Sequence, residues 1–133
     1  MYTAFIVTML AAAANIFSAM CDFVRYKQVS IVMARAGVPE SWMTTLGVLK
    51  AAGALGLLAG MAVPPIGTAA AGGLILFFVT AIITHLRAHD YSFGPAVAFL
   101  LLAVASLTLG LHARAWIFFY YAVSLLCILA VDR

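Results

Sequence analysis

Long apolar runs separated by short polar segments dominate the chain. We predict membrane-spanning helices at about residues 3–23, 43–63, 66–86, 94–111 and 115–131. A span needs about 20 mostly apolar residues, so the first four runs are long enough and the fifth is at the lower limit. Pro64-Pro65 separates the second span from the third, and His112-Ala113-Arg114 is a short polar break before the fifth. The alternative is four spans and a last helix that lies partly in the membrane interface.

Polar residues recur on one face of the first run. Thr8, Asn15, Ser18 and Asp22 follow one another at spacings of seven, three and four. Those spacings place them on the same side of a helix. Such a stripe is expected to face other helices or a cavity, since polar groups are costly in lipid. Helix–helix contact and cavity lining both stay open as interpretations.

The longest polar connection, residues 24–42, predicts a helix on the membrane surface. Residues 24–36 could form an amphipathic helix in the interface, with Val29, Val32 and Met33 toward lipid. Gly37 and the proline two residues later are expected to end it.

Small residues mark the contact between the second and third spans. Ala52, Gly56 and Gly60 form a ridge of small side chains that lets a neighbouring backbone approach closely. The third run begins with small residues (69–73), and only a tight proline turn separates the two runs. We therefore expect these two helices to pack through their small faces.

Composition agrees with a membrane protein of one domain, residues 1–133. The chain is 67% hydrophobic and 8% charged, with a mean hydropathy of +1.19. Soluble domains carry about 25% charged residues. The net charge of +3 does not indicate nucleic-acid binding, because the basic residues do not cluster. Cys21 and Cys127 belong to no metal-binding or redox spacing.

The distribution of Lys and Arg predicts an orientation in the cell inner (plasma) membrane. The first loop holds Arg25, Lys27 and Arg35, the third holds Arg87, and the C-terminus holds Arg133. Cytoplasmic loops carry the excess of such residues. We therefore expect a multi-pass protein with its N-terminus outside and its C-terminus in the cytoplasm.

Several polar residues are predicted to reach one membrane depth. Asp22 ends the first span, and Lys50 lies about 10 Å into the second. His85, Arg87 and Asp90 lie at or just after the end of the third span. An intramembrane lysine needs a partner or water. We expect Asp22 to pair with Lys50, with Asp90 as the second candidate. The candidate ligand-binding residues are Asn15, Asp22, Lys50, His85, Arg87 and Asp90, and the candidate catalytic residues are His85, Arg87 and Lys50.

We predict no metal site. His85 and His89 are four residues apart and could face one way on a helix, but the glutamate of a zinc-binding HExxH motif is missing. Asp90 is the only third ligand nearby. No pair of catalytic carboxylates and no phosphate-binding loop can be identified.

Three segments carry a resemblance to a known family: L-K-A-A-G-A-L-G-L-L-A-G (49–60), A-A-A-G-G-L-I-L-F-F (69–78) and H-L-R-A-H-D (85–90). The chain resembles the DoxX-like family, small bacterial membrane proteins with a four-helix core, over roughly residues 1–112. The resemblance implies an all-α integral membrane fold, a four-helix bundle to which the fifth span would be added. Lys50 matches the lysine of the family's KxxGxxE-like second helix, and Gly56 stands where that pattern has Glu. Asp22 thus becomes the candidate substitute carboxylate.

The resemblance also suggests three functional hypotheses. The first is an accessory or membrane-anchor subunit of a redox or quinone- or lipid-linked process, with a redox partner protein and a quinone or other lipophilic ligand. The second is a small membrane enzyme that acts on a lipophilic substrate, with His85 as acid/base. The third is a scaffold or assembly factor without a ligand site. A homo-oligomer is compatible with all three, and the sequence leaves open whether any catalysis occurs.

Overall fold

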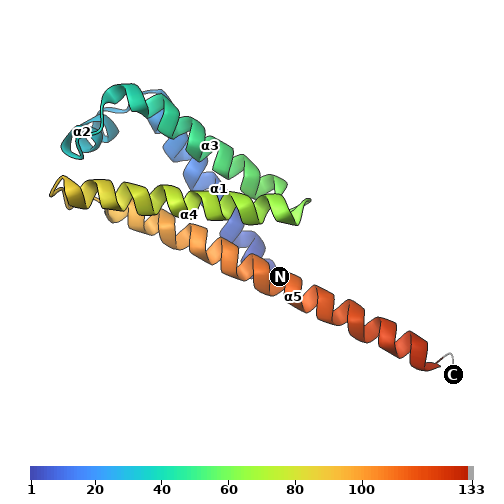
Figure 1. Cartoon of the computed structure of the whole chain (residues 1–133). Coiled ribbons are helices and arrows are strands. Elements are labelled where there is room, and N and C mark those ends of the chain that lie inside the picture. Colours follow the sequence, from blue (N-terminus) through green and yellow to red (C-terminus); the bar gives the residue numbers. More distant parts are fainter. Residues whose placement is uncertain (132–133) are drawn as a thin grey trace.

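The apolar runs form helices in the computed structural model, which describes residues 1–131 and, from residue 125 on, only the course of the helix (Figure 1). The elements are α1 (Tyr2–Phe23), α2 (Lys27–Arg35), the 3₁₀ turn η1 (Glu40–Trp42), α3 (Met43–Ala59), α4 (Pro64–Arg87) and α5 (Gly94–Val131). Within these residues, α1, η1 with α3, α4, and α5 as far as Ser124 are long and apolar enough to cross a membrane. The chain is thus an all-α membrane bundle, as predicted.

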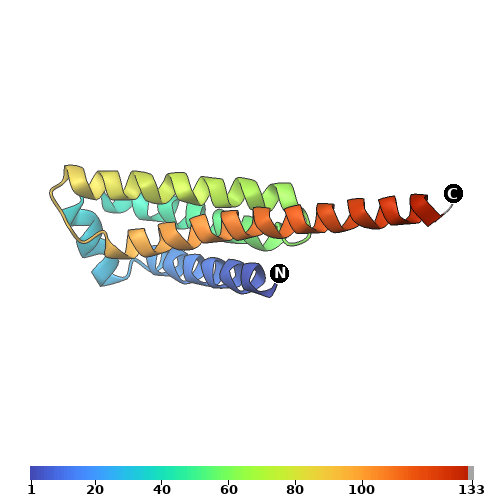
Figure 2. The same cartoon turned by 90° about the horizontal axis from the view of Figure 1, so that it is seen from below.

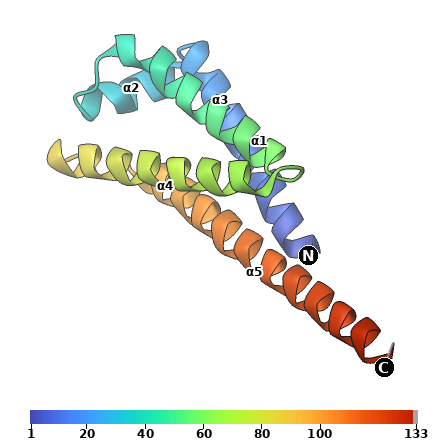
Figure 3. The same cartoon turned by 45° about the vertical axis from the view of Figure 1, so that its right-hand side comes forward.

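Each long helix packs against two others. Helix α1 contacts α3 and α5, and α4 contacts α3 and α5, so the four form a closed bundle. Seen from the side, α3 and α4 lie close together near the turn that joins them and diverge toward the end that carries α2 (Figures 1 and 3).

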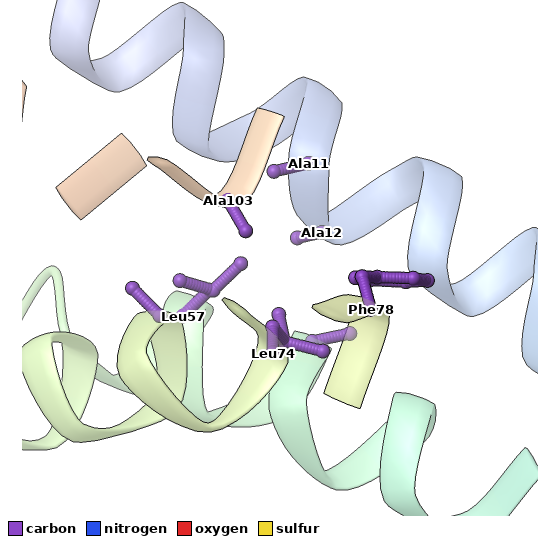
Figure 4. Packing of buried hydrophobic residues seen from close by; sticks show 8 residues of the cluster. Ala11, Ala12, Leu57, Leu74, Phe78 and Ala103 are labelled. Carbon is purple, nitrogen blue, oxygen red and sulfur yellow. The ribbon is translucent and has the colours of Figure 1, made fainter. Parts of the chain in front are cut away.

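Small side chains allow this close packing. Alanines from α1, α3, α4 and α5 lie in the core with a few larger residues, and most of them are visible in Figure 4: Ala11, Ala12, Ala54, Leu57, Ala71, Leu74, Phe78 and Ala103. Phe78 stacks on Phe99 of α5, with ring centroids 5.2 Å apart. Large apolar side chains such as Phe5, Leu55 and Leu101 are exposed on the outside, where lipid would cover them.

Gly56 and Gly60 of the predicted ridge pack against α4, whereas Ala52 is exposed in the cavity wall. A Cβ atom built on Gly56 would meet the side chain of Ala70, and one on Gly60 would meet the backbone of Gly67. Helices α3 and α4 are therefore in backbone contact next to their connecting turn, which fixes the narrow end of the bundle.

The predicted break at His112–Arg114 was wrong. Helix α5 continues from Gly94 to Val131, so the expected fourth and fifth spans are one helix of 38 residues. None of the three residues is Gly or Pro, and α4 satisfies Arg114: its guanidinium donates to Thr68 Oγ1 at 2.6 Å and to the Pro64 carbonyl oxygen at 2.9 Å. A charged residue therefore did not require a turn here.

The continuous helix also changes the expected position of the C-terminal end. Helix α5 is about 57 Å long, against about 30 Å for a bilayer core. Its last turns extend past the other helices, at the end of the bundle where the N-terminus lies (Figure 2). The expected cytoplasmic C-terminus depended on a fifth crossing, which this helix does not make. Arg133, used in that argument, lies outside the described residues, and the side chain of Cys127 is not described either.

Helix α2 is shorter than expected and faces inward. It covers Lys27–Arg35. Val29, Val32 and Met33, which we expected to face lipid, line a partly open cavity. Residues with positive φ flank the helix: Arg25 (51°) and Gly37 (72°). Each is the left-handed residue that ends a helix, α1 or α2, and turns the chain back.

Candidate functional site

A cavity of about 1530 Å³ lies between the helices on the α2 side of the bundle. Its walls come from the second half of α1, from α2, from the first part of α3, from α4 between residues 70 and 85, and from the start of α5. Most lining side chains are apolar, among them Phe17, Leu49 and Phe77. Ser18, Lys50 and His85 add polar groups to the wall. The volume exceeds the roughly 300–1,000 Å³ typical of small-molecule sites.

Lys50 is held in a buried ion pair. Its Nζ donates to Asp22 Oδ2 at 2.8 Å and to Ser18 Oγ at 3.0 Å. The side chains of Lys50 and Asp22 are 8% and 1% exposed. Ser18 and Asp22 are four residues apart on α1, one turn of the helix, and α3 brings Lys50 against both. The expected pairing of Lys50 with Asp22 is confirmed. Asp22 thus provides the carboxylate partner of Lys50, since Gly56 has no side chain that could do so.

His85 forms a second polar cluster at the end of α4. Its Nδ1 lies 2.8 Å from Asp90 Oδ2. Ser92 donates from its hydroxyl to Asp90 Oδ1 at 2.6 Å and from its backbone N–H at 3.3 Å. The turn makes this possible: His89 has φ 54°, and the Asp90 N–H donates to the His85 carbonyl oxygen at 3.0 Å. This helix-ending motif brings Asp90 back beside His85.

The Ser92 hydroxyl lowers the pKa of Asp90 from 3.8; burial opposes this, and the hydrogen bond to His85 lowers it further. Because the folded pKa is lower than the unfolded one, the carboxylate stabilises the fold above the ordinary aspartate pKa. That contribution is lost as the pH falls through the lower folded value. The connection between α4 and α5 is therefore held by an ionised Asp90 at neutral pH.

This gives a pH-dependent prediction for Asp90→Asn. The variant should melt at a lower temperature than the parent protein, by a margin that persists from about pH 7 to about pH 5. The margin should shrink as the pH falls below the ordinary value of 3.8. Thermal melts of both proteins across this range test it, with Glu40→Gln in an exposed pair as the control. A margin that grows as the pH falls below 3.8 would contradict the lowered pKa.

The remaining candidate residues do not line the cavity. Asn15 is fully buried and its Nδ2 donates to the Ala11 carbonyl oxygen at 2.8 Å. Arg87 is exposed at the end of α4. Asp22 and Asp90 touch the cavity only through their partners Lys50 and His85. Of the predicted site residues, Lys50 and His85 are thus the two that can contact a ligand in the cavity.

Ser92 belongs to this site but was not predicted from the sequence. A serine two residues after an aspartate is a common turn pattern, and that spacing was the available signal. Phe77, whose ring centroid is 5.8 Å from Lys50 Nζ, was not predicted either. Phe77 could be found only from packing. Among the described side chains, no group of three His, Cys, Asp or Glu could hold a metal ion.

Together, these features define a multi-pass helical membrane protein with a partly open, mainly apolar cavity between its helices. Residues 6–108 match the model of the DoxX-like family, so the chain belongs to that family. The predicted resemblance is confirmed, and the matched region ends within α5. No curated protein and no solved structure matches the chain.

Proposed function

We propose that the protein is an accessory or membrane-anchor subunit that holds a quinone or another lipophilic molecule for a redox or lipid-linked process. The observation that carries this proposal is the cavity. Its volume, about 1530 Å³, suits a large ligand, and its apolar wall suits a hydrophobic body. Lys50 and His85 lie in the same wall and provide the few polar groups that such sites use to orient a ligand.

We further propose that the α2 end of the bundle faces the cytoplasm, in the inner membrane. The exposed Arg25, Lys27, Arg35 and Arg87 all belong to this end. Such an excess marks the cytoplasmic side. The N-terminus would then be outside, and continuous α5 would carry its C-terminal end to the same side.

A small membrane enzyme is the second candidate, and the His85–Asp90 contact of 2.8 Å favours it. A carboxylate that orients a histidine is the arrangement used in general acid–base catalysis. Arg87 would not serve as the electrostatic group, because it is exposed and outside the cavity wall. A scaffold without a ligand site would need the Lys50–Asp22 pair but has no use for the cavity.

Filling the cavity tests the proposal. Gly73 lines the cavity and Gly72 does not, and a Cβ atom on either would meet nothing within 4 Å. Gly73→Leu should weaken binding of a lipophilic ligand by about tenfold or more, while Gly72→Leu should leave it unchanged. Binding of a decyl benzoquinone and of its hydroquinone to both variants in nanodiscs is the measurement. Equal binding by the two variants, or no binding of either form by the parent protein, would reject the proposed role of the cavity.

A further inference from the structure

Lys50 offers little to an anionic ligand. Its ammonium group already donates to Asp22 and Ser18, and Asp22 balances its charge. Its remaining side lies toward the ring of Phe77. None of the arginines and no other lysine of the described side chains lines the cavity. The cavity therefore lacks the unpaired cation that a carboxylate or phosphate head would need.

His85 has one ring nitrogen in use and one free. An ionised carboxylate accepts hydrogen bonds and donates none, so Nδ1 carries the proton that lies between His85 and Asp90. In a neutral imidazole, Nε2 then keeps its lone pair and acts as an acceptor. Ser92 holds Asp90 in place from the other side and so fixes this arrangement.

Nε2 of His85 is unpaired within the described part of the chain and not fully enclosed. It has no hydrogen-bond partner among the described side chains, and it is not one of the enclosed unpartnered atoms, which belong to Asn15, Asp22 and Ser106. His85 is itself part of the cavity wall. With His85 neutral, its Nε2 can accept a hydrogen bond from a molecule in the mainly apolar cavity.

We propose that the cavity binds an amphiphile with an uncharged hydroxyl group, which donates a hydrogen bond to Nε2 of His85. This inference rests on the proposed function and narrows its ligand to hydroxyl-bearing molecules, such as a hydroquinone or a long-chain alcohol. Asp90 and Ser92 are positioning residues, because they act on the ligand only through His85. A quinone has only acceptor oxygens, so the reduced partner of a quinone pair is the form that fits.

Three probes of similar length separate the ligand classes: a decyl hydroquinone, its dimethyl ether and a fatty acid. Trp42 lines the cavity, so its fluorescence in a Trp116→Phe background reports binding in nanodiscs under argon. The hydroquinone should bind about tenfold more tightly than the ether, because the ether leaves a buried acceptor without a donor. The fatty acid should bind no more tightly than the ether.

Substitutions connect this preference to His85. His85→Ala should remove the advantage of the hydroquinone over the ether. Asp90→Asn should reduce that advantage while leaving ether binding unchanged, whereas general damage to the fold would weaken both. His112→Ala is the matched control, since His112 is an exposed histidine of α5 outside the cavity wall.

The outcomes separate the two proposals. Equal affinity for hydroquinone and ether, or tighter binding of the fatty acid, would overturn the hydroxyl inference and leave the lipophilic site standing. Failure of all three probes to bind the parent protein would overturn the proposed function and the inference with it. An unchanged hydroquinone preference in His85→Ala would also overturn the assignment of Nε2.

Discussion

Lys50→Met should lower the free energy of unfolding by about 3–5 kcal/mol, because it leaves the Asp22 carboxylate buried without a cation. The pair is 2.8 Å apart, and Asp22 Oδ1 already lacks a partner among the described residues. Adding Asp22→Asn to Lys50→Met removes the uncompensated charge and should restore most of the loss. Unfolding of the single and double variants in mixed micelles measures the coupling.

The exposed pair of Arg25 and Glu40 is the control for this experiment. Its atoms are 3.5 Å apart, and its side chains are 51% and 59% exposed. Arg25→Ala should therefore change stability by at most about 1 kcal/mol. If Lys50→Met proved as mild as Arg25→Ala, the buried pair would not be a main determinant of the α1–α3 contact.

Gly60→Ala should be the second most damaging change, with a loss of about 1–3 kcal/mol from overpacking. A methyl group at this position would meet the backbone of Gly67, which cannot move away as a flexible side chain can. Gly72→Ala is the matched control, because a Cβ atom there would meet nothing within 4 Å. Unfolding of both variants under the same conditions tests the contact, and equal stability would show that α3 and α4 can separate without loss.

The two polar clusters were predictable to different degrees. Lys50 and Asp22 could be matched from the sequence, since a buried lysine needs a carboxylate and their predicted depths agree. The contact between His85 and Asp90 was not predicted. It depends on a left-handed residue, His89, and nothing in the side chain of a histidine requires that conformation.

The break predicted at His112–Arg114 shows a limit of reading polarity alone. A charged residue in an apolar run suggests a loop, because a lone charge in lipid is costly. Here Thr68 and the Pro64 carbonyl oxygen satisfy Arg114, and both lie on another helix. Whether a polar residue ends a helix therefore depended on a neighbour 46 residues away in the chain.

The sequence by itself determined the membrane class, the first three apolar spans, the glycine contact and the pairing of Lys50 with Asp22. These follow from local hydrophobicity and from the cost of an unpaired charge, which every arrangement of the helices must satisfy. The tertiary structure alone decided the cavity, the inward face of α2, the continuity of α5 and the free nitrogen of His85. Each of these depends on the angles between helices and on which side chains meet, and periodicity along one helix carries no information about either.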